Sequence, residues 1–315
     1  MKTVFTFRPP RKLQAQLIEN YPSIEFIFYK TVEEAEELIH AEIIVTFGED
    51  LTPQHIEECK QLKWVMVASA GLEKMPFASF KDKDILVTNA RGVHKIPMAE
   101  FTLGYLLNHV KRFPELRKLQ GEAIWNKRLP ISELADQTLL VLGTGAIGSE
   151  IARLADAFRI KTIGINRSGR AVDYFAAVYP IDQLLTVLPE ADFVVSILPS
   201  TNETKHLLKK EHFQAMKNTA AFINIGRGDV LEEKVLIEAL NKEEIAHAYL
   251  DVFEQEPLPE EHAFWSHENI TVTPHISSIT PQYLPRVFEI FEYNLERYLQ
   301  GSDVYKNRVD INRGY

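Results

Sequence analysis

The chain has 315 residues, 45% of them hydrophobic and 25% charged, which is enough for two domains with ordinary cores. Its net charge of −9 argues against non-specific nucleic-acid binding, so an anionic substrate must be attracted by local positive groups. The single cysteine, Cys59, excludes an internal disulfide and a multi-cysteine zinc site. Residues 1–10 lack a signal-peptide pattern, and no run reaches the ~18 to 20 apolar residues of a membrane span. We therefore expect a cytoplasmic protein without membrane or nucleic-acid partners.

The first third of the chain alternates short apolar runs with helical patterns, which predicts a parallel sheet. A helix is expected over Thr31–Ile39, with Val32, Ala35, Leu38 and Ile39 as its apolar stripe and its acidic residues in solvent. Cys59 is expected to be half-buried in a helix that follows Thr52-Pro53. The predicted strands are Val4–Phe7, Ile24–Phe28, Ile43–Thr46, Trp64–Val67 and Ile85–Thr88.

A long helix is predicted from Met98 to about Leu119, and it leads into a second alternating region. The strands of this region are nearly continuous apolar runs, which is typical of strands buried on both faces. One helix is expected at Leu231–Leu240, and a last one, Gln282–Leu299, returns to the first domain. The second set of predicted strands is Leu139–Leu142, Thr162–Ile165, Phe193–Ile197, Ala221–Ile225, Ala248–Leu250 and Ile270–Thr273.

A glycine fingerprint follows the strand Leu139–Leu142 and opens a helix. In it Gly143 permits a tight turn, Gly145 lets the backbone approach a pyrophosphate, and Gly148 lets helix and strand pack closely. The free N–H groups at the helix start favour a phosphate. The predicted dinucleotide-binding turn comprises Gly143, Thr144, Gly145, Ala146, Ile147 and Gly148. About 140 residues precede it, so it does not open the chain as in a simple dinucleotide enzyme.

Four polar residues follow strands of this region, where a doubly wound sheet places its ligands: Arg227, Asp251, Glu256 and His275. Hydride transfer to a 2-oxo acid needs a cation that binds the carboxylate and polarises the ketone, and an acid that protonates the alkoxide. Arginine suits the first role and histidine the second, and a carboxylate beside the histidine favours its charged form. Taken singly, Arg227 could be a surface loop residue, His275 a strand cap and Glu256 a solvated turn.

Together these motifs resemble the D-isomer-specific 2-hydroxyacid dehydrogenases over nearly the whole chain. The resemblance rests on the fingerprint, Leu198-Pro199 with Thr204, Gly226-Arg227-Gly228, residues 251–259 and Thr273-Pro274-His275. It implies an α/β fold of two doubly wound parallel-sheet domains, in which a Rossmann cofactor domain is inserted into a split flavodoxin-like substrate domain. The expected boundaries are 1–97 and 281–315 for the substrate domain and 98–280 for the cofactor domain.

The resemblance also assigns roles to residues. Arg227 would bind and polarise the substrate, His275 would donate the proton, and Glu256 would be its carboxylate partner. Backbone N–H groups of Ser69, Ala70 and Gly71 would take the other side of the substrate carboxylate, although Gly71-Leu72-Glu73 departs from the usual Gly, apolar residue, Asp. Met98-Ala99-Glu100 would form the hinge of a closing motion. The remaining cofactor contacts would come from Leu198, Pro199, Thr204, Ile225, Gly226 and Asp251. Asp251 would lie near the nicotinamide and help to orient the pair of His275 and Glu256.

The cofactor choice is predicted from the end of the second strand of the cofactor domain. An acidic residue there would bind the ribose hydroxyls of NAD, but this chain has Asn166, Arg167, Ser168 and Arg170. Arginines and a serine offer charge and a hydroxyl to a 2′-phosphate, although Arg170 could be a solvated loop residue. We therefore expect NADP(H) to be preferred, with NAD(H) possible.

The first hypothesis is an NADPH-dependent reductase that converts glyoxylate or hydroxypyruvate to a D-2-hydroxy acid. Enzymes like phosphoglycerate, formate or phosphite dehydrogenase are competing oxidoreductases, and a corepressor-like nucleotide sensor is the alternative from another class. No metal site is expected, because His94, His109, His206, His212 and His247 share no ligand spacing and are interpreted as surface or packing residues. The resemblance implies a homodimer. Trp125 is expected to pack within its own chain, with a place near a partner's active site as the lesser hypothesis.

Overall fold

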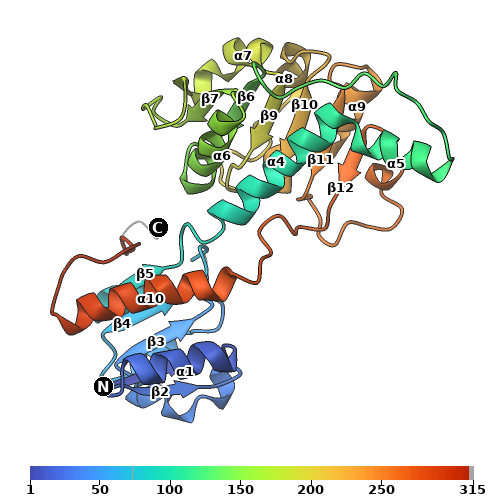
Figure 1. Ribbon diagram of the computed structural model, residues 1–315. Coiled ribbons are helices and arrows are strands. Elements are labelled where there is room, and N and C mark those ends of the chain that lie inside the picture. The colour runs from blue at the N-terminus through green and yellow to red at the C-terminus, as the bar shows by residue number, and fades with distance from the viewer. Residues whose placement is uncertain (73, 312–315) are drawn as a thin grey trace. The chain divides into compact units, whose positions relative to one another are not determined.

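The computed structural model describes residues 1–72 and 74–311, and the chain forms two compact units (Figure 1). Unit 1 comprises Met1–Val93 and Thr280–Tyr315, and unit 2 comprises His94–Ile279. The sequence-based boundaries were residues 97 and 280. One continuous segment thus forms unit 2, and the two ends of the chain together form unit 1. Among the described residues, no helix is both long and apolar enough to cross a membrane.

Unit 1 contains a parallel sheet in the order β2-β1-β3-β4-β5, the flavodoxin-like arrangement. Helix α10 lies along this sheet (Figure 1) and buries Val287, Phe288, Phe291 and Leu295. The indole of Trp64 stacks on Phe291 with a centroid distance of 5.4 Å. The elements of this unit are β1 (Lys2–Phe5), α1 (Arg11–Asn20), β2 (Glu25–Phe28), η1 (Val32–Glu34), η2 (Glu36–His40), β3 (Ile43–Thr46), α2 (Pro53–Glu58), β4 (Trp64–Val67), α3 (Phe77–Asp82), β5 (Leu86–Asn89) and α10 (Tyr283–Leu299).

Unit 2 contains a seven-stranded parallel sheet in the order β12-β11-β10-β9-β6-β7-β8. The strand order reverses between β6 and β9, the switch point where doubly wound sheets bind ligands. The helices and 3₁₀ helices are α4 (Lys95–Lys111), α5 (Phe113–Gly121), α6 (Ala146–Ala157), η3 (Ile181–Gln183), α7 (Leu184–Val187), η4 (Leu188–Glu190), α8 (Lys210–Ala215), η5 (Gly228–Val230), α9 (Glu233–Asn241) and η6 (Ala263–Trp265). The strands are β6 (Thr138–Leu142), β7 (Lys161–Asn166), β8 (Ala177–Pro180), β9 (Phe193–Ser196), β10 (Ala221–Asn224), β11 (His247–Leu250) and β12 (Ile270–Val272). This architecture confirms the predicted fold class.

The predicted helix over Thr31–Ile39 is wrong in type. The segment forms two 3₁₀ helices, η1 and η2, that meet at Ala35. In a 3₁₀ helix side chains three apart share a face, so Val32, Ala35 and Leu38 are buried together. Ile39 falls off that face and is 43% exposed. The sequence-based prediction placed Ile39 on the apolar face because it assumed the α-helical period of 3.6 residues.

The predicted helix from Met98 to Leu119 is in fact two helices. Helix α4 ends where Arg112 adopts a left-handed conformation with φ of 55°, and α5 begins at the next residue. Pro114 accounts for the break. Proline has no backbone N–H to donate to the carbonyl of Val110, and its ring would collide with that carbonyl in a continuous helix. The sequence-based prediction overlooked this proline.

Two further differences lie at an edge strand and a helix end. Strand β8 was not predicted; it ends in Pro180 and is only half-buried, both typical of an edge. Cys59 caps α2 and is fully buried, not half-buried in the helix. Burial raises the pKa of its thiol to about 11.

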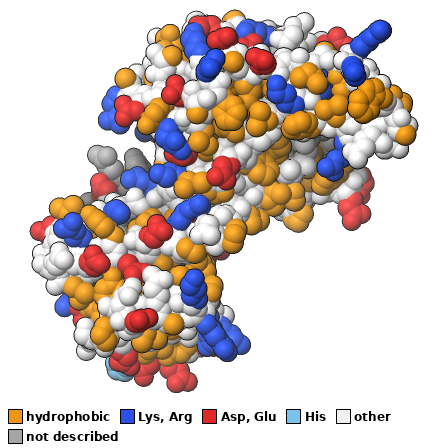
Figure 2. Space-filling view, viewed as in Figure 1, with side chains coloured by type: hydrophobic (Ala, Val, Ile, Leu, Met, Phe, Trp, Pro, Cys, Tyr) orange, Lys and Arg blue, Asp and Glu red, His pale blue; other side chains and the backbone are white. Residues whose placement is uncertain are grey.

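Apolar side chains gather on the outside of unit 2 around α5 and the segment that follows it (Figure 2). The exposed residues here are Phe113, Leu116, Ile124 and Trp125. Trp125 is 87% exposed, so the expectation that it packs within its own chain is wrong. We call these four residues the α5 patch.

Candidate active site

The glycine turn after β6 combines a left-handed backbone, a close contact within the turn and one position with open space around it. Gly143 has φ of +107°, and a Cβ on Gly148 would lie 2.0 Å from the carbonyl oxygen of Gly143. A Cβ on Gly145 would meet no protein atom within 4 Å. Gly143 and Gly148 are therefore required by the protein's own packing, whereas the bare backbone at Gly145 leaves room for a ligand. Because α6 starts at Ala146, its unbonded N–H groups face the same space.

The loop after β7 is organised by Asn166. Its amide donates to Thr144 Oγ1 at 3.0 Å and to the Arg170 carbonyl at 3.0 Å, and its oxygen accepts from Ser168 N–H at 3.1 Å. The side chain thus ties the loop to the glycine turn. Arg167 is 78% exposed and its guanidinium donates to Glu203 at 3.0 Å. Arg170 is exposed.

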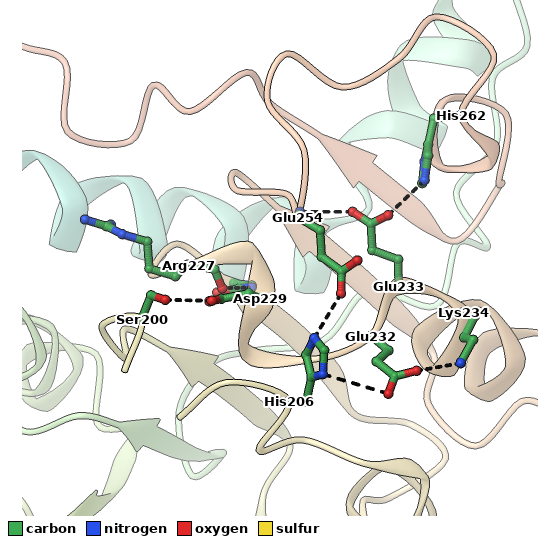
Figure 3. Close-up of polar contacts among 10 residues, drawn as sticks. Ser200, His206, Arg227, Asp229, Glu232, Glu233, Lys234, Glu254 and His262 are labelled. Atoms are coloured by element: carbon green, nitrogen blue, oxygen red, sulfur yellow. Dashed lines mark hydrogen bonds and ion pairs between the residues drawn. The ribbon is translucent and has the colours of Figure 1, made fainter. Parts of the chain in front are cut away.

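The turn Gly226-Arg227-Gly228 is held between two backbones. A Cβ on Gly226 would lie 2.7 Å from the Leu198 carbonyl oxygen, and one on Gly228 would lie 1.9 Å from the Phe253 carbonyl carbon. Asn224, at the end of β10, donates to the Arg227 carbonyl at 3.0 Å. The Arg227 side chain is exposed, and in Figure 3 it extends away from Asp229 and Ser200. The fold therefore presents this guanidinium outward from a fixed turn.

His275 and Glu256 form a direct pair. His275 Nδ1 lies 2.7 Å from Glu256 Oε2, and the other oxygen of Glu256 accepts from Phe253 N–H at 3.0 Å. Both side chains are partly exposed, at 44% and 36%. His275 has φ of +52°, a left-handed conformation that non-glycine residues rarely adopt and that clusters at functional sites. With Nδ1 engaged, Nε2 is the ring atom left for a substrate.

Asp251 lies under this loop and is fully buried. Its carboxylate accepts from the N–H groups of Ile276 and Ser277, each at 2.9 Å, and from the Thr273 hydroxyl at 2.6 Å. The resemblance implied that Asp251 lies near the nicotinamide and helps to orient the pair of His275 and Glu256. Its contacts with the His275 loop agree with the orienting part of that prediction, and its place near the nicotinamide stays a prediction.

Loops after neighbouring strands are tied together beside Arg227 (Figure 3). Ser200 donates to Asp229 at 2.6 Å, and His206 lies 3.5 Å from Glu254 and 3.9 Å from Glu232. The sequence suggested no role for these residues, because their partners are far apart in the chain and carry no motif spacing. Of the predicted cofactor residues here, Thr204 bonds the Pro199 carbonyl, while Leu198 and Ile225 are buried.

His94 is also near Arg227 and was interpreted only as a surface or packing residue. Burial lowers the pKa of its imidazole, the Ser278 backbone opposes this shift, and the Arg227 charge lowers the pKa further. Among residues 1–72 and 74–311, no group of three or more His, Cys, Asp or Glu side chains is placed to hold a metal ion.

The predicted substrate loop lies in unit 1. Ser69 Oγ donates to the Gly71 carbonyl at 2.9 Å, and Asn89 donates to the Ala70 carbonyl at 3.2 Å. The loop is therefore anchored to the end of β5. Glu73, the departure from the family pattern, lies outside the described residues.

A Rossmann-type sheet with a glycine turn at its switch point, and an arginine and a carboxylate-paired histidine on neighbouring loops, defines a dinucleotide-dependent oxidoreductase. The family model for the D-isomer specific 2-hydroxyacid dehydrogenase NAD-binding domain matches residues 103–277. The chain belongs to this family, which confirms the resemblance found in the sequence. It is accordingly a 2-hydroxyacid dehydrogenase or reductase that uses a pyridine nucleotide.

Relatives within the family carry different activities. A glyoxylate/hydroxypyruvate reductase B of Enterobacter sp. is 32% identical over 96% of this chain and 95% of that protein. A D-3-phosphoglycerate dehydrogenase of Methanocaldococcus jannaschii is 30% identical over 91% of this chain but only 55% of that protein. The structure of an NADPH-dependent glyoxylate/hydroxypyruvate reductase from Sinorhizobium meliloti, in complex with NADP and sulfate, has a TM-score of 0.79 with 26% identity, covering 100% and 99% of the two chains.

Proposed function

We propose that the protein reduces glyoxylate or hydroxypyruvate to the D-2-hydroxy acid with NADPH. The observation that carries this proposal is the 2.7 Å pair of His275 and Glu256 on the loop next to the Gly226-Arg227-Gly228 turn. The names of the Enterobacter and Sinorhizobium relatives support the substrate class.

When bound, a reduced nicotinamide would supply the hydride for reduction of the substrate carbonyl, and the residues of this chain would bind the substrate and supply the proton. The Arg227 guanidinium binds the carboxylate and polarises the ketone, a task for which its planar fork and permanent charge are suited. His275 donates a proton from Nε2 to the developing alkoxide, since Nδ1 is engaged by Glu256. Glu256 stabilises the imidazolium and is itself fixed by Phe253 N–H. Ser69, Ala70 and Gly71 are proposed to bind the carboxylate through their backbone.

The turn Gly143–Gly148 and the residues around it would hold the cofactor. The open space at Gly145 and the start of α6 fit a pyrophosphate. The preference for NADPH is supported by Asn166 in place of an acidic residue, with the exposed Arg167 and Arg170 beside it. Pro199, Thr204 and Gly226 complete the proposed cofactor set.

The test is the loss of reduced-nicotinamide absorbance with NADPH or NADH and either 2-oxo acid. We expect faster oxidation of NADPH, and a fall of about 10²- to 10⁴-fold in kcat for His275→Ala. Arg227→Ala should raise KM for the 2-oxo acid as well as lower kcat. Retained turnover in His275→Ala would contradict the mechanism. NADPH binding without turnover of any 2-oxo acid would favour the nucleotide sensor.

A second candidate function is the oxidation of 3-phosphoglycerate, favoured by the similarity to the Methanocaldococcus enzyme. The same assay, run with 3-phosphohydroxypyruvate, separates the two. Turnover at a higher kcat/KM than with glyoxylate or hydroxypyruvate would support this candidate.

We further propose that the protein is a homodimer, because the α5 patch exposes four large apolar side chains on α5 and the segment that follows it. Light scattering after gel filtration should give twice the 36.1 kDa chain mass. The paired substitutions Ile124→Ser and Trp125→Ser should shift the mass toward the monomer, and Trp265→Ser is the matched control because Trp265 is exposed elsewhere on unit 2.

A further inference from the structure

We propose that Tyr105 and Thr273 are positioning residues for His275, acting through Asp251. This inference rests on the proposed function and adds to it a chain of hydrogen bonds that runs from helix α4 to the catalytic loop. Tyr105 lies within α4, and Thr273 lies directly after β12, so the two residues come from elements far apart in the sequence. Tyr105 belongs to no motif of the sequence analysis, and Thr273 opens the Thr273-Pro274-His275 motif, in which only His275 was given a role.

The direction of these hydrogen bonds follows from the number of protons that each group can donate. The Thr273 hydroxyl lies 2.6 Å from Asp251 Oδ1, to which it donates. A threonine hydroxyl has one proton, so the Thr273 oxygen can only accept from the Tyr105 hydroxyl 2.7 Å away. Each group thus donates to the next, from Tyr105 to Thr273 to Asp251.

The last hydrogen bonds of the series are made to the backbone of the loop that carries His275. The two oxygens of Asp251 accept from the N–H groups of Ile276 and Ser277, the residues that follow His275. The His275 N–H in turn bonds the Thr273 carbonyl at 3.1 Å, which closes a tight turn around a residue with φ of +52°. A left-handed histidine persists only where its surroundings fix it. The Thr273 hydroxyl supplies one of the three donors to the carboxylate that fixes this turn.

Tyr105 is itself held rigidly. Its ring contacts Phe101 edge-on at a centroid distance of 4.9 Å and Tyr249 at 4.6 Å. Burial raises the pKa of the Tyr105 hydroxyl, so it stays protonated and remains a donor over the working range of pH. The first donor of the hydrogen-bond series, the Tyr105 hydroxyl, is therefore fixed within the core.

The test uses two pairs of matched variants. Thr273→Val removes the central hydroxyl. Thr271→Val is its control, because Thr271 is two residues earlier, within β12, and bonds His247 Nε2 at 2.9 Å. Tyr105→Phe removes the terminal donor. Tyr249→Phe is its control, because that hydroxyl contacts His109 at 3.3 Å, outside the chain to Asp251.

We expect Thr273→Val to lower kcat about 10-fold, the size of one lost hydrogen bond to a charged group. KM for NADPH and for the 2-oxo acid should change by less than about twofold, because neither the glycine turn nor Arg227 is touched. Thr273→Ser should restore kcat, since it keeps the hydroxyl. Tyr105→Phe should lower kcat by a smaller factor, and both controls should leave it unchanged.

Three results would overturn the inference: a Thr273→Val enzyme with wild-type kcat, a Thr271→Val enzyme that is equally impaired, or a Thr273→Ser enzyme that is not rescued. If Thr273→Val does not fold, Tyr105→Phe against Tyr249→Phe decides, because both keep the aromatic ring. Failure of the proposed function has a different signature, since His275→Ala would then retain turnover whatever the Thr273 variants do.

Discussion

Two histidines in unit 2 occupy opposite ends of neighbouring strands and behave differently. His275 follows β12 at the carboxyl end of the sheet, is partly exposed, and pairs with the carboxylate of Glu256. His247 begins β11 at the amino end, lines a cavity of about 820 Å³, and bonds the hydroxyl of Thr271. Burial, with the His109 and Arg112 charges, lowers the pKa of His247 to about 4. The partner and the solvent, not the residue type, thus separate a histidine suited to proton donation from one that stays neutral.

The sharpest way to break this comparison is to remove the charge that pairs with His275 and, in a separate variant, to remove His247 itself. Glu256→Gln keeps the shape of the partner but removes its charge, so we expect kcat to fall by about 10²- to 10⁴-fold. His247→Gln at the other end should leave kcat within about twofold. Steady-state kinetics with NADPH and a 2-oxo acid measures both. Equal losses in the two variants would show that the contrast between the ends has no bearing on catalysis.

Two glycines of the turn after β6 allow a comparison at the carboxyl end of the sheet in unit 2. Gly148→Ala places a Cβ 2.0 Å from the Gly143 carbonyl oxygen, so we expect a loss of about 3 kcal/mol in the free energy of unfolding, the upper end of the usual range for overpacking. Gly145→Ala meets no protein atom and should leave thermal stability unchanged while raising KM for the cofactor. Thermal melts and cofactor titrations separate the two. A destabilised Gly145→Ala protein would contradict the division of roles.

The pH dependence of stability tests the role of His247 at the amino end of the sheet in unit 2. The pKa of His247 is about 4 in the folded protein, against an ordinary value of 6.5 for a solvated histidine, so the unfolded chain binds the proton first as pH falls. Its neutral form contributes full stability above pH 6.5, and we expect up to about 3 kcal/mol to be lost between pH 6.5 and pH 4. Urea unfolding over this range should show a weaker pH dependence in His247→Gln. An unchanged slope would assign the acid sensitivity to other groups.

A smaller effect is expected at the cofactor loop. Arg167→Ala removes a charged donor to the proposed 2′-phosphate and should raise KM for NADPH about tenfold, with KM for NADH unchanged. Arg159→Ala is a control, because it removes a charge at the other end of β7. A parallel rise for NADH would mean that Arg167 acts on the loop and not on the phosphate.

The smallest effect concerns the Arg167 partner. Glu203 holds the guanidinium at 3.0 Å, so a phosphate must displace it. Exposed pairs of this kind are worth about 0.2 to 1 kcal/mol, so Glu203→Gln should lower KM for NADPH by about two- to fivefold. The gain should shrink in high salt, where the pair is already screened. A weaker affinity for NADPH would show that Glu203 orders Arg167 for the phosphate instead of competing with it.

Sequence alone predicted the features that depend on local pattern. The strands other than β8 follow from apolar runs, and the glycine turn follows from residue types at fixed places. The roles of Arg227, Glu256 and His275 stay predictions from the same kind of pattern. The break at Arg112 could also have been found from Pro114, whose effect on a helix is local. The 3₁₀ pair at Val32–His40 is harder, since only the burial of Val32, Ala35 and Leu38 distinguishes a period of three.

The contacts that support the site could not be predicted from the sequence alone. Tyr105 reaches Thr273 across more than half of the chain, and His206 contacts Glu254 through packing of separate loops. Such pairs have no spacing that a single sequence can show. The same holds for Asp251: its place after β11 and an orienting role were predicted, but its bonds to the N–H groups of Ile276 and Ser277 were not.

The stacking of Trp64 in unit 1 offers an optical consequence. The chain has three tryptophans, and Trp125 and Trp265 of unit 2 are already in contact with water. Trp64 is fully buried, stacks on Phe291 of α10 and donates its indole N–H to Thr88 at 2.9 Å. In the monomeric Ile124→Ser, Trp125→Ser protein, a red shift of intrinsic fluorescence during denaturation therefore reports mainly on unit 1, and comparing it with circular dichroism shows which unit melts first.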